Sequence, residues 1–146
     1  MKPDELARAC ASAMWANDDA SRGLGMELVE IAAGRAVIAM SVEERMTNGQ
    51  DICHGGFIFT LADSAFAFAC NGANQFAVAQ HCAVTFLAPA YAGDRLTAAA
   101  VERISHGRSG IYDVTVTDQK DQVIAEFRGH SRTVPGQHLP GGEAGQ

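Results

Sequence analysis

The stretch over residues 54–70 constrains the fold most strongly, because it is apolar on every face of a possible helix. It opens with Gly55 and Gly56 and carries one acidic residue, Asp63, near its middle. A helix that is apolar all round is usually buried, whereas a carboxylate is rarely buried without a partner or a function. We therefore predict a buried central helix over residues 56–70 and a functional role for Asp63.

The composition indicates one globular domain without a nucleic-acid or membrane partner. The chain has 146 residues, of which 47% are hydrophobic, and this is enough for one core. Its formal net charge of −6 argues against non-specific nucleic-acid binding, which favours basic surfaces. No apolar run reaches the roughly 18 residues of a membrane span. The N-terminus lacks the apolar segment of a signal peptide.

The cysteines and histidines do not suggest a metal site. The four cysteines show no C-x-x-C spacing, and the five histidines are also scattered. Apolar neighbours around the cysteines are typical of reduced, buried thiols. We therefore expect a cytoplasmic protein that needs no metal or other cofactor. The cysteines are Cys10, Cys53, Cys70 and Cys82.

Hydrophobic periodicity and turn residues divide the chain into two helices and six strands. We expect one domain over residues 1–134. The last segment, 135–146, is rich in glycine and proline, which predicts a flexible tail. The expected elements are a short helix over 4–16, strands over 24–31 and 35–42, the long helix over 56–70, and strands over 77–87, 95–105, 111–117 and 123–134.

This order of elements predicts an α+β fold. An apolar helix cannot stand in water, and the simplest packing is a curved antiparallel sheet wrapped around it. The short N-terminal helix adds to this unit. A single sheet cannot cover every face of the central helix, so we expect a homodimer or a larger assembly.

The glycine pair at the start of the helix has two interpretations. Glycine permits a sharp turn from loop to helix. It also lets a substrate oxygen approach the free N–H groups at the positive end of the helix dipole, which forms an oxyanion hole. The local sequence does not favour either interpretation. By default, His54 is a helix cap and Asn48 is a turn residue.

Asp63 lies on a helical stripe with Thr60, Ser64 and Ala67. This small and polar stripe can face a cleft or a partner subunit. A desolvated carboxylate there can act as a nucleophile or as a general base. Three arginines of the second half are individually typical of solvated surface charges, but together they can bind phosphates. They are Arg108, Arg128 and Arg132.

Several motifs of the chain occur together in one order, spread over residues 20–134. They are Asn48-x5-His54-Gly55-Gly56-x6-Asp63, Phe86-Leu87-Ala88-Pro89-Ala90-x-x-Gly93-Asp94-x-Leu96, Gly107-Arg108-x-Gly110-x-Tyr112-Asp113 and Phe127-Arg128-Gly129. In these motifs the chain resembles the hotdog-fold acyl-CoA thioesterases, and most closely their phenylacetate-degradation (PaaI-type) group.

The resemblance implies hydrolysis of an acyl-CoA to free acid and CoA, without a metal, at a site shared by two subunits of a homodimer or homotetramer. The expected substrate is phenylacetyl-CoA, hydroxyphenylacetyl-CoA or a similar acyl-CoA. The Gly55 N–H of one subunit would hold the thioester oxygen, and Asp63 of the other would attack the carbonyl or activate water. Asn48 would orient the water or the acyl group, and His54 would support the loop or contact the thioester. The expected CoA contacts are Gly56, Arg108, Ser109, Arg128 and Arg132.

Helix geometry favours such a shared site independently of the resemblance. Eight residues separate Gly55 from Asp63, which is about 12 Å along one helix, so one subunit's pair cannot reach the same carbonyl. Two alternatives remain, namely a hydratase or dehydratase on the same fold and a non-catalytic acyl-CoA binding module. The chain also departs from its relatives in two places. Ala79 and Gln80 stand where a hydroxyl residue is common, and Ala88 stands where arginine is common.

Overall fold

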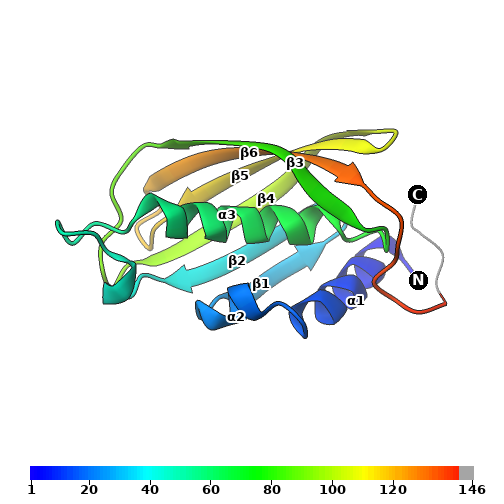
Figure 1. The fold of residues 1–146 in the computed structure, drawn as a ribbon, viewed down its shortest axis with the longest axis horizontal. Coiled ribbons are helices and arrows are strands. Elements are labelled where there is room, and N and C mark those ends of the chain that lie inside the picture. Colours follow the sequence, from blue (N-terminus) through cyan, green and yellow to red (C-terminus); the bar gives the residue numbers. More distant parts are fainter. Residues whose placement is uncertain (142–146) are drawn as a thin grey trace.

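One antiparallel sheet curves around a central helix in the computed structural model, which describes residues 1–141 (Figure 1). The six strands are in the order β1-β2-β4-β5-β6-β3. The predicted α+β arrangement is confirmed. The helical elements are α1 (Pro3–Trp15), α2 (Asp19–Gly23), the 3-10 turn η1 (Glu44–Met46) and α3 (Gly55–Cys70). The strands are β1 (Glu27–Ala32), β2 (Arg35–Ser41), β3 (Ala77–Phe86), β4 (Arg95–His106), β5 (Ser109–Thr117) and β6 (Val123–Thr133).

The core lies between α3 and the concave face of the sheet. Strand β5 shows the alternation clearly, because every second residue from Gly110 to Val116 is buried toward the helix. On α3, Leu61 and Phe66 are fully enclosed, and each such side chain contributes about 1.5–3 kcal/mol by burial. Phe66 packs so closely on β6 that a Cβ on Gly129 would lie 2.8 Å from its ring. Glycine at 129 therefore makes room for this ring.

Helix α2 was not expected from the sequence. The Asp18 side chain caps it by accepting a hydrogen bond of 2.9 Å from the Ser21 N–H. With five residues it is too short to show a hydrophobic period. Because α2 occupies residues 19–23, β1 begins at Glu27 rather than at the predicted residue 24.

Strand β3 forms an edge of the sheet, because only β6 pairs with it within residues 1–141. It has ten residues, and most of them are exposed. The opposite edge, β1, lies beside α1 (Figure 1). A long exposed edge strand presents unpaired backbone groups to another chain.

The chain after β6 returns to the connection between α3 and β3. The Phe76 N–H donates to the Gly136 carbonyl at 3.0 Å. The Asn74 side chain accepts hydrogen bonds of 2.9 Å from the backbone N–H groups of His138 and Leu139. This segment is the first part of the predicted flexible tail, whose residues 142–146 lie outside the described residues.

No helix within residues 1–141 combines the length and the apolarity that crossing a lipid bilayer requires.

Candidate active site

The N-terminus of α3 is held by its preceding loop. His54 is the N-cap, and its Nδ1 accepts a hydrogen bond of 2.9 Å from the Gly56 N–H. Since Nδ1 is the acceptor, the neutral ring carries its proton on Nε2. The backbone N–H of His54 donates to the Met46 carbonyl at 2.7 Å. The default interpretation of His54 as a cap is therefore confirmed.

Gly55, the first residue of α3, keeps a free backbone donor. Its N–H has no acceptor in the part of the chain that the structure describes, and it lies at the positive end of the helix dipole. The absence of a side chain also has a packing reason. A Cβ at this position would lie 2.9 Å from Cζ of Phe86. The missing side chain thus leaves the N–H accessible to a ligand and also leaves space for the Phe86 ring.

Asn48 shapes the loop before the helix with one half of its amide. Its Oδ1 accepts hydrogen bonds from the N–H groups of Gln50 at 2.9 Å and Ile52 at 3.4 Å, which is an Asx turn. Its Nδ2 donates no hydrogen bond within residues 1–141. Asn48 therefore fulfils its default role in a turn and retains a free donor.

A groove of about 510 Å³ lies beside the N-terminus of α3. Asn48 and Gly55 line it, and most of the remaining lining is apolar, including Ile58 of α3 and Phe86 and Leu87 at the end of β3. An apolar groove with a few converging donors is the usual form of a small-molecule site.

Asp63 lies near the middle of α3 and does not line this groove. Its side chain is half-buried, and burial raises the pKa of its carboxyl. It forms no ion pair with any described residue. The pKa of the Cys82 thiol on β3 is raised, mainly by burial and to a lesser extent by the Asp63 carboxylate. Burial raises the pKa of Cys70 to about 12, and Asp63 adds to this effect.

The other polar residues of the predicted stripe are bonded within the protomer. The Ser64 and Ser21 hydroxyls lie 2.8 Å apart, and the Ser21 hydroxyl donates to the Asp18 carboxylate at 2.7 Å. Helix α2 thus covers Ser64. The Thr60 hydroxyl bonds back to the helix backbone at 2.8 Å. Asp63 is left as the one residue of the stripe whose polar group has no partner among the described residues.

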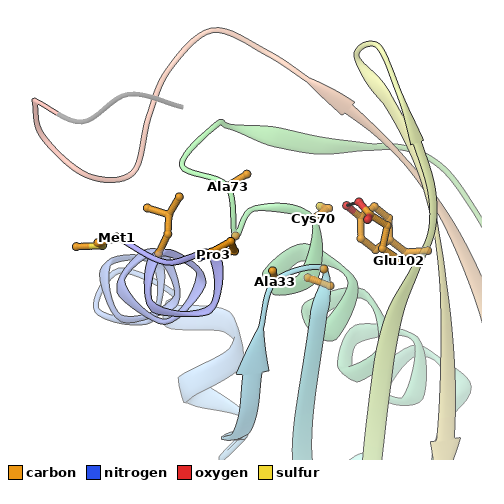
Figure 2. Close-up of a pocket in the computed structure, with 11 residues that line it drawn as sticks. Met1, Pro3, Ala33, Cys70, Ala73 and Glu102 are labelled. Carbon is orange, nitrogen blue, oxygen red and sulfur yellow. Dashed lines mark hydrogen bonds between the residues drawn. The ribbon is translucent and has the colours of Figure 1, made fainter. Parts of the chain in front are cut away.

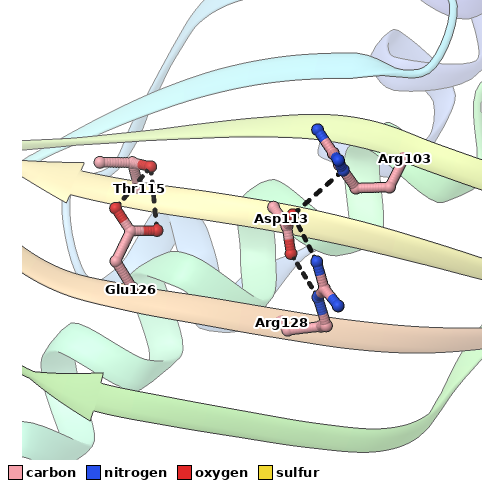
Figure 3. Close-up of polar contacts among 5 residues, drawn as sticks. All are labelled: Arg103, Asp113, Thr115, Glu126 and Arg128. Atoms are coloured by element: carbon pink, nitrogen blue, oxygen red, sulfur yellow. Dashed lines mark hydrogen bonds and ion pairs between the residues drawn. The ribbon is translucent and has the colours of Figure 1, made fainter.

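The predicted phosphate contact Arg128 lies on the outer face of the sheet, away from α3 (Figure 3). Its guanidinium donates two hydrogen bonds to the carboxylate of Asp113 on β5, from Nε at 2.7 Å and from Nη2 at 2.9 Å. Arg103 of β4 adds a contact of 3.4 Å to the same carboxylate. The hydrogen bond from Arg128 holds the pKa of Asp113 below its usual range. Arg132 is exposed on the same strand as Arg128.

Two further predicted contacts, Arg108 and Ser109, lie near the other end of α3. The Arg108 Nη2 donates to the Thr133 carbonyl at 3.0 Å. Both residues line a cavity of about 440 Å³ that also contains Cys70, the last residue of α3. Within one protomer, the structure therefore places Arg108 and Ser109 at the opposite helix end from the groove at Gly55. Gly56 is exposed at the beginning of α3.

A neighbouring cavity of about 340 Å³ also lies at the C-terminal end of α3 (Figure 2). It is bounded by α1 on one side and by Cys70 and Glu102 on the other. The Tyr112 hydroxyl donates to the Glu102 carboxylate at 3.0 Å, and burial raises the pKa of Tyr112. The sequence did not predict this pair, because a bulge between Glu102 and Ile104 shifts the strand register there. Within residues 1–141, no group of three or more His, Cys, Asp or Glu is arranged to hold a metal ion.

Comparison with known proteins identifies the family. The model of the Thioesterase superfamily matches residues 50–125. The acyl-coenzyme A thioesterase PaaI of Escherichia coli K12 is 43% identical over 126 residues, which cover 86% of this chain and 90% of that protein. A putative esterase of Archaeoglobus fulgidus is 31% identical, over 88% of this chain and 83% of its own length.

Solved structures agree with this assignment. The structure of E. coli PaaI, from the phenylacetic acid degradation operon, superposes with a TM-score of 0.91 and 41% identity, and it covers 92% of this chain and 97% of that chain. A variant of the phenylacetic acid degradation protein PaaI from Thermus thermophilus gives a TM-score of 0.75 at 35% identity, over 78% and 97% of the two chains. The chain therefore belongs to the thioesterase superfamily, in the PaaI-type group of hotdog-fold acyl-CoA thioesterases, and it is a thioester hydrolase.

Proposed function

We propose that this enzyme hydrolyses an acyl-CoA, with the Gly55 N–H of one subunit and Asp63 of another acting on the same thioester carbonyl. The observation that carries the proposal is the separation, on one helix, of two groups that have no partner among residues 1–141. The free N–H and the half-buried carboxylate lie eight residues apart, or about 12 Å. A second protomer running in the opposite direction can supply the missing half of each site.

The exposed edge of β3 supports this assembly. Besides burial, the Asp63 carboxylate raises the pKa of Cys82, which belongs to this strand. We propose that a copy paired along this edge lies close to the carboxylate. A symmetric dimer formed in this way closes the open sheet edge and contains two equivalent sites. We propose that two such dimers join into a homotetramer.

The chemistry follows from the groups at each half-site. The Asp63 carboxylate removes a proton from water, or attacks the carbonyl carbon itself, and burial favours both actions by raising its pKa. The carbonyl oxygen becomes an oxyanion that the Gly55 N–H stabilises. The free Nδ2 of Asn48 orients the water or the acyl group. The C–S bond then breaks. If water is the nucleophile, the proton that Asp63 removed from it passes to the leaving CoA sulfur, and the free acid is formed directly. If Asp63 is the nucleophile, an anhydride between Asp63 and the acyl group remains; water cleaves it to the free acid and the regenerated carboxylate, and supplies the proton for the CoA sulfur. His54 holds the loop by capping α3.

The apolar lining of the groove supports an aryl-acetyl substrate such as phenylacetyl- or hydroxyphenylacetyl-CoA. For the CoA portion we propose contacts with Gly56, Arg108, Ser109, Arg128 and Arg132. Arg128 can bind a phosphate only if it loses one or both of its hydrogen bonds to Asp113. The arginine that is common before Pro89 in relatives is Ala88 here. We propose no cofactor, and we propose action in the cytoplasm, where the free thiols stay reduced.

The direct test is a panel of acyl-CoAs followed by the release of free thiol. Phenylacetyl- and hydroxyphenylacetyl-CoA should be hydrolysed with the highest kcat/KM, ahead of acetyl- and hexanoyl-CoA. Crotonyl-CoA distinguishes the hydratase alternative, since hydration removes the enoyl absorbance without releasing thiol. A non-catalytic binding module would bind these compounds saturably and release no thiol from any of them.

Mixing inactive variants tests the shared site. Asp63→Asn and Asn48→Ala should each abolish most of the activity. In a mixed dimer, however, one site combines Asp63 from one subunit with Asn48 from the other. Random exchange of subunits should restore about a quarter of the wild-type activity, because half of the dimers are mixed and each has one intact site. If the mixture stays inactive after verified subunit exchange, the site lies within one subunit.

A further inference from the structure

The Phe86 ring is directed at Gly55 with its Cζ atom, the tip of the ring, closest. A Cβ built on Gly55 would lie 2.9 Å from Cζ and 3.3 Å from both Cε1 and Cε2. The nearest atom is the far end of the ring, and the two flanking atoms are equally distant, so the ring is directed end-on at this position. Real Cβ atoms essentially never lie closer than 3.0 Å to another heavy atom. With a side chain at 55, the ring tip of Phe86 would therefore have to move from this position.

Phe86 belongs to the groove rather than to the core. It ends β3, where Cys82 and Val84 pack against the core as partly buried neighbours. Phe86 is 49% exposed and lines the groove together with Gly55 and Asn48. A large aromatic ring gains from burial, so a half-exposed ring beside a free N–H offers apolar surface to a ligand.

We propose that Phe86 is a specificity-determining and positioning residue of the thioester site. Its tip closes one side of Gly55, so that a carbonyl can reach the N–H only along the groove. The edge of the ring then lies against the carbon atoms next to that carbonyl. Unbranched and aryl-acetyl groups fit this slot, whereas groups that branch at the carbon next to the carbonyl collide with the ring. The inference rests on the proposed function and adds a side chain that selects the acyl group.

The selectivity follows from the shape of the ring. In Phe86→Leu the position stays apolar but loses the ring tip. The kcat for phenylacetyl-CoA should fall about 10-fold, because an edge contact between aromatic rings is lost and the carbonyl is held less firmly. At the same time, kcat/KM for the branched isobutyryl-CoA should rise relative to phenylacetyl-CoA. Phe86→Tyr places a hydroxyl on Cζ, directly against Gly55, and should reduce the activity with both substrates.

A double-mutant cycle tests the contact itself. The backbone of Gly55 does not have a positive φ, so alanine is compatible with the start of the helix. In the wild-type background, Gly55→Ala should lower kcat about 100-fold, because the new Cβ pushes the Phe86 ring into the groove. In the Phe86→Leu background, the same substitution should cost less than about 10-fold. An equal cost in both backgrounds would overturn the proposal, since Gly55 would then serve substrate access alone.

A second measurement keeps the inference independent of turnover. Calorimetric titration with a ketone analogue of phenylacetyl-CoA, which has a methylene between sulfur and carbonyl, gives Kd without hydrolysis. The affinity should show the same coupling between positions 55 and 86, and additive effects on Kd would contradict it. A wild-type protein that binds the analogue but releases no thiol contradicts the proposed function alone. The matched control is Phe76→Leu, which changes a ring of 37% exposure directly before the start of β3, away from Phe86. It should leave kcat and Kd unchanged.

Discussion

Asp63 and Asp113 are the same side chain in opposite environments. Asp63 lies on α3, loses hydration to its apolar surroundings and has no ion-pair partner among the described residues, so its pKa is raised. Asp113 lies on the outer face of the sheet, where Arg128 and Arg103 hold its pKa low (Figure 3). The first carboxylate is costly to the folded protomer and available for chemistry. The second stabilises the fold and is already occupied.

The largest expected difference between the two carboxylates is in catalysis. Asp63→Asn should lower kcat by about 10²- to 10⁴-fold, the usual contribution of a positioned acid or base. Asp113→Asn, the same change on the outer face, should leave kcat within about twofold, because Asp113 does not line the groove. The measurement is the rate of thiol release at saturating phenylacetyl-CoA. If both variants keep the wild-type rate, Asp63 has no catalytic role.

The two variants should also shift the thermal stability in opposite directions at neutral pH. The folded state disfavours the ionised form of Asp63, so asparagine removes a destabilising charge and should raise Tm. Asparagine at 113 removes the carboxylate that Arg128 and Arg103 share and should lower Tm. Calorimetry of both proteins at one concentration, with the oligomeric state checked, measures the two shifts. The comparison fails if both shifts have the same sign.

The pH dependence of these shifts follows from the direction of each pKa change. The raised pKa of Asp63 means that its cost is absent in acid and grows as the pH rises through the ordinary aspartate range to the raised folded value. The lowered pKa of Asp113 means that its stabilisation is complete above its ordinary value and is lost as the pH falls through the lowered one. Both Tm differences should therefore shrink toward zero in acid. The acid limb of kcat/KM should lie above the ordinary aspartate pKa of about 3.9.

The smallest expected effect is the difference in Tm between variants of the two arginines that contact Asp113. Arg128 makes two hydrogen bonds of 2.7 and 2.9 Å to Asp113, whereas Arg103 makes one contact of 3.4 Å. A bidentate pair is the stronger arrangement. Arg128→Gln should thus lower Tm more than Arg103→Gln, and both effects should weaken at high salt because the groups are exposed. Equal shifts would show that the paired geometry does not matter.

The sequence was sufficient to predict the buried helix and the isolated position of Asp63. Both depend on local pattern, because a run of apolar side chains around one carboxylate has few ways to be satisfied. The strands were placed to within one or two residues for most elements, since their alternation and turn residues are also local. β1 is the exception, because α2 has too few residues to leave a periodic signal.

The ion pair of Asp113 with Arg128 could not be predicted in the same way, because it depends on strand register. Near the turn, Thr117 pairs with Val123, and continuing that register would place Asp113 opposite Phe127. A bulge between Val116 and Thr117 shifts the pairing by one residue, so that Asp113 lies opposite Arg128. The contact of Phe86 with Gly55 likewise joins two distant segments, and nothing in either motif reveals it.

The protonation of the cysteines has a practical consequence for measuring the enzyme. Reagents that detect liberated CoA react with thiolates, and a protein's own cysteines often consume them or are inactivated by them. Here burial raises the pKa of all four thiols, and the charge of Asp63 reinforces the effect at Cys70 and Cys82. The native protein should therefore contribute almost no background signal. A slow rise in signal without substrate would instead report unfolding, so the activity assay contains its own control for protein integrity.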